Sequence, residues 1–256
     1  MKKKYILLAL FISLVSFSLK ERPTIYIIGD STVKNGKIFN GQKIVGWGEL
    51  LQDSFDSTKI SIDNEAIPGR SSRTYITENH WNNVLAKIKA GDYLLIQFGH
   101  NDPANIADTL KPRGSIKGIG EDSTQVYNNV FKRKEYVHSY GWYLNKIVTE
   151  AKHKGAYPII ITPIPRHIFT NGKVDRNNLD YGKWSKEIAT KNNIPLIDLN
   201  EKVAKIYDSL GFEYTYKFFP KDHTHTNLEG ARINANQIIH SIKTQPDLTP
   251  LRKYLY

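Results

Sequence analysis

Serine, histidine and aspartate residues occur at spacings that could build a nucleophilic catalyst. Ser31 stands in Gly29-Asp30-Ser31-Thr32, directly after a short run of β-branched residues. A serine at such a glycine-assisted turn can present its hydroxyl and its backbone N–H to a cleft. Gly-Asp-Ser is also a common turn sequence, so the triplet predicts chemistry only if partners exist elsewhere in the chain.

Asp222 and His225 are the expected partners. A serine hydroxyl becomes a good nucleophile when an imidazole removes its proton, and an acceptor must hold that imidazole in the correct tautomer. Because Asp222 precedes His225 by three positions in a turn, its carboxylate can reach Nδ1 and leave Nε2 for the serine. His223 lacks this spacing and is expected to be a packed or solvent-facing loop residue. A metal site at Asp222, His223 and His225 is the alternative, but it lacks distant ligands and any Cys, so we predict no metal.

Acyl transfer also needs donors aimed at the developing oxyanion. The backbone N–H of Ser31, the N–H of Gly69 and the side-chain amide of Asn101 are candidates, since each follows a predicted strand. Gly69 is suitable because a residue without Cβ lets the backbone approach a substrate. Singly, each has an ordinary explanation as loop geometry. Together, and in this order, they favour a serine hydrolase.

The segments around these residues alternate between strand-like and helix-like patterns, which predicts a parallel sheet covered by helices. The expected strands are 24–28, 59–62, 93–98, 158–162 and 194–197. The expected helices are 81–89, 135–154, 176–192, 199–210 and 227–242, with apolar residues at helical spacing in 47–55. We therefore predict a three-layer αβα domain of the α/β class with a central parallel sheet of about five strands.

In open parallel sheets ligands bind beyond the carboxyl ends of the strands, where the candidate residues are expected. From residue 103 to about 134 the chain is polar and contains glycine, and it is too long for a routine connection. Loops of this length in compact domains tend to be functional or mobile.

In this order, the Gly-Asp-Ser triplet, the Gly69 loop, Gly-X-Asn-Asp and Asp-X-X-His resemble the four blocks of the SGNH (GDSL-type) hydrolases. Wider matches resemble the rhamnogalacturonan acetylesterase branch, and Thr32 stands where lipolytic relatives usually have Leu. The matching segments are 28–33, 46–48, 64–74, 97–102 and 221–226. The resemblance covers about residues 24–242.

The resemblance implies a flavodoxin-like fold, no cofactor and release of acetate from pectic sugars. It assigns the nucleophile to Ser31, oxyanion donors to Gly69 and Asn101, the orienter to Asp222 and the base to His225. Pro68 departs from the pattern, because such proteins often have Gly there.

Charge bears on the partners of the protein. Lys and Arg number 36 against 25 Asp and Glu, a formal net charge of +11 over 256 residues. Such a surface favours polyanions, meaning nucleic acid, anionic lipid or an acidic polysaccharide. No basic run interleaved with aromatic residues follows the N-terminal stretch, so we expect no nucleic-acid partner. Nothing in the residues specifies an oligomeric state.

The N-terminus resembles a signal peptide spanning residues 1–18. Three lysines precede a run without charge from Tyr5 to Phe17, and Ser16 and Ser18 place small residues where a signal peptidase cleaves. The run is shorter than the roughly 20 residues that span a bilayer. We expect a secreted or periplasmic protein, with residues 19–256 forming a single domain and no stable membrane anchor.

The expected substrate is an acetylated polysaccharide with an acidic backbone, whose carboxylates Arg70 and Arg113 would bind. Arg70 is the stronger candidate because it follows Gly69, and further cations expected near the cleft are Arg73, Lys111, Arg166 and Lys221. A solvated basic face is the ordinary alternative for each. Acetylated xylan, lipid or thioester substrates remain open. A non-catalytic polysaccharide-binding protein is disfavoured, because it would be expected to lack a member of the triad.

Overall fold

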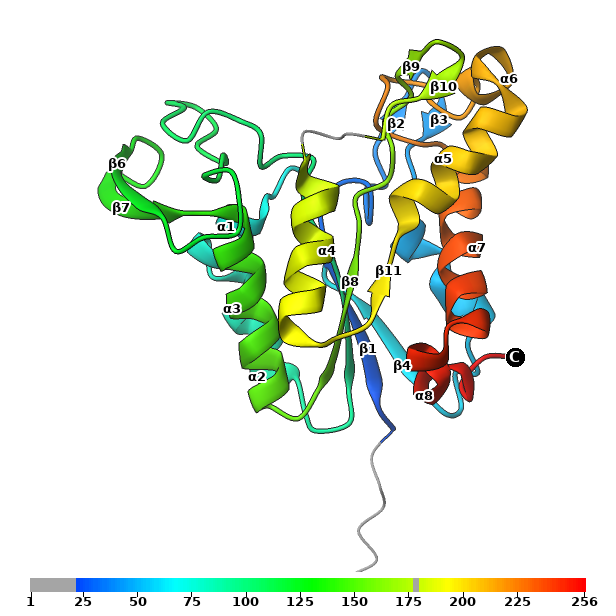
Figure 1. Cartoon of the computed structure of the whole chain (residues 1–256), viewed down its shortest axis with the longest axis horizontal. Coiled ribbons are helices and arrows are strands. Elements are labelled where there is room, and N and C mark those ends of the chain that lie inside the picture. The colour runs from blue at the N-terminus through cyan, green and yellow to red at the C-terminus, as the bar shows by residue number, and fades with distance from the viewer. Residues whose placement is uncertain (1–21, 177–179) are drawn as a thin grey trace, which may run out of the picture.

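A computed structural model describes residues 22–176 and 180–256 (Figure 1). Five strands form a central parallel sheet in the order β4-β1-β5-β8-β11. Strand β1 therefore lies between β4 and β5, which are the next two strands of this sheet along the chain. This is the flavodoxin-like strand order, and the predicted fold class is confirmed. The strands are β1 (Thr24–Gly29), β4 (Ser61–Asn64), β5 (Tyr93–Gln97), β8 (Tyr157–Ile161) and β11 (Leu196–Ile197).

Successive side chains of a strand point to opposite faces of the sheet, so the core consists of two halves, one on each face. Ile25 and Ile27 of β1 point into one cluster of buried side chains, and Tyr26 and Ile28 point into the other. Both faces are apolar because helices cover both, as is usual for a parallel sheet. The molecule therefore has three layers, as Figure 1 shows.

One face of the sheet is covered by helices α1 to α4 and the other by α5, α7 and two 3₁₀ turns. The helices are α1 (Ser72–Thr77), α2 (His80–Lys87), α3 (Tyr140–His153), α4 (Tyr181–Asn192), α5 (Leu199–Leu210), α6 (Phe212–Tyr216), α7 (Leu228–Thr244) and α8 (Thr249–Arg252). Asn227 caps α7: its side chain accepts from the N–H of Gly230. Among the described residues no helix is long and apolar enough to cross a membrane.

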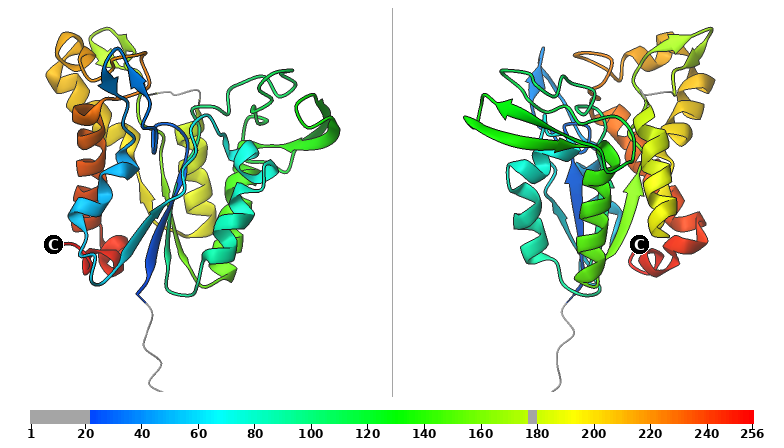
Figure 2. Two further views of the ribbon diagram at one scale, coloured as in Figure 1. Left: turned by 180° about the vertical axis from the view of Figure 1, so that it is seen from behind. Right: turned by 60° about the vertical axis from the view of Figure 1, so that its left-hand side comes forward.

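Three two-stranded hairpins stand outside the sheet and were not expected from the sequence. They are β2 (Ile38–Phe39) with β3 (Gln42–Lys43), β6 (Ser123–Asn128) with β7 (Arg133–His138), and β9 (Phe169–Thr170) with β10 (Lys173–Val174). The β6–β7 hairpin belongs to a long connection between β5 and α3, residues 103–138, which we call the arm. Figures 1 and 2 show the arm projecting from the carboxyl-end edge of the sheet.

The predicted helix 135–154 begins too early. Residues 133–138 pair with β6 as strand β7, and α3 starts only at Tyr140. Ser139 sets this boundary, because its side chain accepts from the N–H of Trp142 as an N-cap.

Other predicted helices also differ from the structure. Segment 47–55 forms two 3₁₀ turns, η1 (Trp47–Glu49) and η2 (Leu51–Ser54), and the predicted helix 176–192 starts at Tyr181. Residues 177–179 and the predicted signal peptide lie outside the described residues.

Candidate active site

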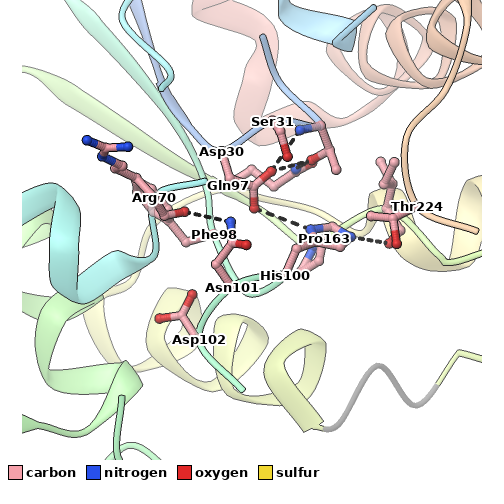
Figure 3. A network of polar contacts seen from close by, with 12 residues as sticks. Asp30, Ser31, Arg70, Gln97, Phe98, His100, Asn101, Asp102, Pro163 and Thr224 are labelled. Atoms are coloured by element: carbon pink, nitrogen blue, oxygen red, sulfur yellow. Dashed lines mark hydrogen bonds and ion pairs between the residues drawn. The ribbon is translucent and has the colours of Figure 1, made fainter. Parts of the chain in front are cut away.

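The loops that follow β1, β4 and β5 lie at one edge of the sheet, together with the loop that precedes α7. Ser31 follows β1, Gly69 follows β4, and His100 and Asn101 follow β5. The loop before α7 carries Asp222 and His225. It docks near the start of η1, where Val45 N–H donates to Thr226 O (2.9 Å) and Thr226 Oγ1 donates to Val45 O (3.1 Å). Four segments distant in sequence thus meet at the carboxyl ends of the strands (Figure 3).

Ser31 contacts His225 directly. The distance from Ser31 Oγ to His225 Nε2 is 2.8 Å, and Ser31 is largely buried, with 8% of the residue exposed. A turn after β1 presents it, because the N–H groups of Val33 and Lys34 both donate to Asp30 O.

Asp222 holds the other side of the His225 ring. Its Oδ2 lies 2.8 Å from Nδ1, and its Oδ1 accepts from the backbone N–H groups of Thr224 (2.8 Å) and His225 (2.9 Å). Burial alone would raise the pKa of Asp222, but these hydrogen bonds and the nearby imidazole lower it below its ordinary value. An ionised carboxylate only accepts, so Nδ1 carries the proton and the lone pair of Nε2 faces Ser31.

His223 has a different partner. Arg166 Nη1 donates to His223 Nε2 and to Thr224 Oγ1, both at 3.0 Å, and Arg166 Nη2 donates to His100 O at 3.1 Å. A guanidinium only donates, so His223 acts here as an acceptor. Arg166 was expected to be a cation at the cleft mouth. It lies between two loops of the site and ties the loop of His225 to the loop after β5.

The backbone N–H groups of Ser31 and Gly69 are without an acceptor among the described residues. Gly69 has φ +81° and follows Pro68 in a turn closed by the bond from Arg70 N–H to Ile67 O (3.3 Å). Proline then glycine suits the two central positions of a type II turn, so Pro68 is compatible with this loop path. A Cβ on Gly69 would meet only Arg113 Nη1 at 3.9 Å. The positive φ therefore requires glycine here, and close packing within the chain does not.

Asn101 contributes a side-chain donor. Its Nδ2 donates to Arg70 O at 2.9 Å, a bond that Figure 3 shows, and the second Nδ2 hydrogen has no acceptor in the part of the chain that the structure describes. The bond joins the loop after β5 to the Gly69 turn, so two of the three predicted oxyanion donors, Asn101 and Gly69, belong to connected loops.

Directly behind Ser31 lies a buried carboxylate whose role the sequence did not reveal. Asp30 Oδ2 is 3.4 Å from His100 Nδ1, and Asp30 Oδ1 accepts from Thr32 N–H and Oγ1, both at 2.8 Å. Burial alone would raise the pKa of Asp30, but His100 and Thr32 lower it. His100 Nε2 donates to Ile164 O at 3.1 Å. Asp30 thus lies between its own turn after β1 and His100 of the loop after β5. Its position immediately before Ser31, at a strand end, was the sequence signal that could have singled it out.

Asp102 is a second buried carboxylate that the sequence did not single out. Its Oδ1 accepts from Ser72 N–H (3.1 Å), Ser72 Oγ (2.5 Å) and Ser115 Oγ (3.3 Å). Burial raises the pKa of Asp102 to about 7, although the hydrogen bonds from Ser72 act in the opposite direction. Asp102 thereby joins the end of β5 to the first turn of α1 and to the arm.

The predicted substrate-binding cations differ in their surroundings. Arg70 pairs with Glu78 (Nε to Oε2, 2.6 Å), and Arg113 Nη1 lies 3.5 Å from Gly69 O. Arg73 was expected near the cleft, but its side chain is fully buried. It pairs with Glu135 and donates to Ile106 O (2.9 Å) and Gly114 O (2.8 Å). Arg73 therefore pins the arm to α1 and is not available to a substrate.

A metal is not needed to explain the site geometry. Among residues 22–176 and 180–256, no group of three or more His, Cys, Asp or Glu side chains has an arrangement that could hold a metal ion.

Comparison with known proteins identifies the chain's relatives. Residues 25–238 match the family model described as GDSL-like lipase/acylhydrolase. The chain is 30% identical over 220 residues to a rhamnogalacturonan acetylesterase of Emericella nidulans, covering 86% of this chain and 84% of that protein. It is 33% identical to the probable rhamnogalacturonan acetylesterase YesY of Bacillus subtilis, covering 86% and 92%.

Solved structures agree on the fold. The acetylxylan esterase Axe2 of Geobacillus stearothermophilus superposes with a TM-score of 0.60 at 19% identity, covering 87% of this chain and 95% of that one. At this identity the likeness concerns the fold alone.

Proposed function

The chain belongs to the GDSL-like lipase/acylhydrolase family, and on that premise we propose that it releases acetate from acetylated rhamnogalacturonan with Ser31 as nucleophile. Family membership and the acetylesterase relatives make it a carbohydrate ester hydrolase. Its pectic substrate and the roles of its residues are our proposal. The observation that carries it is the unbroken series of contacts from Ser31 Oγ through His225 to Asp222.

In the first half-reaction Ser31 Oγ attacks the carbonyl carbon of the acetyl group and its proton passes to His225 Nε2. Asp222 stabilises the resulting imidazolium through Nδ1–H. The oxyanion accepts hydrogen bonds from the N–H groups of Ser31 and Gly69 and from Asn101 Nδ2, which supports charge where it develops. The intermediate collapses, His225 protonates the sugar oxygen, and the sugar leaves as an alcohol.

In the second half-reaction water replaces the sugar. His225 takes a proton from the water, the hydroxide attacks the acetyl-Ser31 ester, and a second oxyanion forms in the same place. Collapse of this intermediate breaks the bond to Ser31 Oγ, which recovers its proton from His225. Acetate and free enzyme result, so no group beyond substrate and water is consumed.

The test is acetate release from a panel of acetylated rhamnogalacturonan, acetylated xylan and a small acetyl ester. We expect the highest kcat/KM on rhamnogalacturonan, and none on any of them for Ser31→Ala. A serine-directed organophosphorus reagent should label Ser31 alone. Higher kcat/KM on xylan would overturn the pectic substrate, and labelling of another serine would overturn the nucleophile.

We further propose that the chain is exported and cleaved after Ser18, as the charge and length pattern of residues 1–18 indicates. The N-terminal sequence of protein recovered outside the cytoplasm tests this. An uncleaved N-terminus on the recovered protein would refute cleavage.

A further inference from the structure

A cavity of about 260 Å³ opens beside Gly69. One wall is the Gly69 turn with α1 and its C-terminal end, and the other is the arm. Its lining includes Arg70, Glu78, Lys111, Arg113, Val130 and Phe131. The cavity therefore shares Gly69 with the proposed oxyanion site, and any ligand in it would lie next to the reacting ester.

The cavity carries excess positive charge. Three cations line it, Arg70, Lys111 and Arg113, against the single carboxylate of Glu78. Glu78 is already engaged, since its Oε2 lies 2.6 Å from Arg70 Nε and 3.0 Å from His80 Nε2. The charge of Arg70 is thus balanced, and Lys111 and Arg113 supply the excess.

Neither of these two cations has a carboxylate partner at ion-pair distance among the described residues. Asp108 is a carboxylate on which both cations act electrostatically. The backbone N–H groups of Lys111 and Leu110, which donate to its Oδ1, lower its pKa most, and the two cations lower it further. Those two hydrogen bonds occupy the carboxylate as a turn cap. The sequence favoured Arg70 over Arg113, and the surroundings of the two side chains reverse that order.

Arg113 has unused hydrogen-bonding capacity. Its Nε is buried without an acceptor among the described residues, and its Nη1 reaches only Gly69 O at a long 3.5 Å. A buried donor without an acceptor is costly, and a guanidinium fork matches a carboxylate in two parallel hydrogen bonds. An anion in the cavity could accept from this guanidinium, and a carboxylate matches its geometry best.

The opposite wall is apolar and exposed. Val130 and Phe131, in the turn between β6 and β7, are 51% and 41% exposed, and both line the cavity. Exposed apolar side chains beside a concave surface are typical of ligand grooves. A ligand that uses both walls carries a carboxylate on a ring with an apolar face, which describes a uronic acid residue.

We propose that this cavity is a subsite for a uronate residue of the substrate chain, with Arg113 and Lys111 binding the carboxylate and Phe131 packing on the sugar ring. The proposal rests on the proposed function, because it places the uronate relative to an acetyl group at Ser31. It accounts for a cationic cavity that a neutral polysaccharide would not use.

The test compares Arg113→Gln with Arg232→Gln, which removes the same charge from an exposed position of α7. Substrates are acetylated rhamnogalacturonan, acetylated xylo-oligosaccharides without uronate and 4-nitrophenyl acetate. We expect Arg113→Gln to raise KM for rhamnogalacturonan about tenfold or more, as loss of a charged hydrogen bond predicts, with kcat nearly unchanged. The two neutral substrates should change less than twofold, and Arg232→Gln should resemble the wild type on all three.

Binding without turnover separates this proposal from the proposed function. Uronate-containing and neutral oligosaccharides without acetyl groups are titrated into Ser31→Ala, with and without Arg113→Gln. We expect preference for the uronate oligosaccharide in the single variant and about tenfold weaker binding in the double variant. Equal affinity for both oligosaccharides would overturn the subsite even if acetate release succeeds. A failed acetate assay would leave this binding result intact.

Lys111→Gln is a second variant with little risk of misfolding, because Lys111 is exposed. We expect an increase in KM of a few fold on rhamnogalacturonan alone. The assignment would be refuted if Lys111→Gln and Arg113→Gln both left KM unchanged on every substrate.

Discussion

The strand-end loops and the arm face each other across the same edge of the sheet, yet they are built differently. Around Ser31 and His225 the loops are short and their side chains contact one another, with buried Asp30 and Asp102 behind them. The arm extends over residues 103–138, and its outer hairpin is mostly exposed. The loops fix atoms to within hydrogen-bond distances, whereas the arm offers charge and surface. We infer that reaction chemistry and substrate selection are carried by separate regions.

The largest effect is expected from substitutions in the strand-end loops. Ser31→Ala and His225→Ala should each lower kcat by several orders of magnitude on every substrate, charged or neutral, because each removes a member of one catalytic unit. The double variant should be little worse than either single variant. Steady-state kinetics with the small ester and with polymer measure this. A variant that keeps a tenth of wild-type kcat would remove that residue from the mechanism.

The next largest effect is expected when the attachment of the arm to α1 is weakened. Arg73→Met leaves the carboxylate of Glu135 without its cation, and removal of one partner from a buried ion pair typically costs about 3–5 kcal/mol. We expect faster proteolysis within residues 103–138 and weaker binding of polymer, with kcat on the small ester kept within a few fold. Limited proteolysis and mass spectrometry locate the cuts. Arg73→Met combined with Glu135→Gln should recover part of the loss, and equal loss of small-ester activity would contradict the separation.

Asp102 joins the two regions, and its pKa of about 7 gives a pH test. An unfolded aspartate titrates near pH 4, so between about pH 4 and 7 the folded protein holds a proton that the unfolded chain has lost. Stability from this group therefore falls as pH rises through that window. Asp102→Asn cannot titrate, and its Oδ1 can still accept from Ser72 and Ser115. Relative to wild type, the variant should gain about 3 kcal/mol in unfolding free energy between pH 5 and pH 8.

Urea unfolding at both pH values measures that difference. Asp108→Asn serves as a control, because this partly exposed carboxylate has a lowered pKa and should not change the pH 5 to 8 dependence. Parallel pH profiles for wild type and Asp102→Asn would show that Asp102 is ionised throughout.

The smallest expected effect is the salt dependence of KM, which tests the charges of the arm. Salt screens exposed charges over about 10 Å at 0.1 M, so KM on acetylated rhamnogalacturonan should rise a few fold as salt increases. KM on a neutral acetyl ester should hardly change, because the strand-end donors act at contact distance. Arg113→Gln should flatten the salt dependence. Equal salt dependence of KM on both substrates would show that the positive charge of the protein does not contribute to substrate recognition. It would favour a neutral polysaccharide as substrate.

The two regions also differ in how far the sequence predicts them. The parallel sheet and the loops that carry Ser31, Gly69, Asn101, Asp222 and His225 follow from strand patterns and spacing, whereas the flavodoxin-like strand order was implied only by the family resemblance. The catalytic roles of these residues remain predictions. The arm does not follow from its sequence. Residues 123–128 are polar and mostly exposed, so no apolar alternation marks β6, and Glu135 suggested a helix where pairing with β6 makes a strand.

The role of Arg73 was equally hidden. Three of its partners, Ile106 O, Gly114 O and Glu135, come from the arm, and nothing in local sequence indicates that a tertiary contact will bury a guanidinium. Arg70 and Arg113 could not be ranked for the same reason. Only the fold shows that Glu78 balances one of them.

The distance in sequence between Ser31 and His225, 194 residues, has a consequence for when the protein becomes active. Synthesis runs from the N-terminus, so the proposed nucleophile leaves the ribosome long before its proposed base. The loop of His225 then docks through Thr226 on Val45 and through Arg166 on the loop after β5. Nascent or truncated chains that stop before residue 222 therefore hold an unactivated serine. During refolding, the return of esterase activity reports the docking of the C-terminal part of the chain onto the N-terminal part.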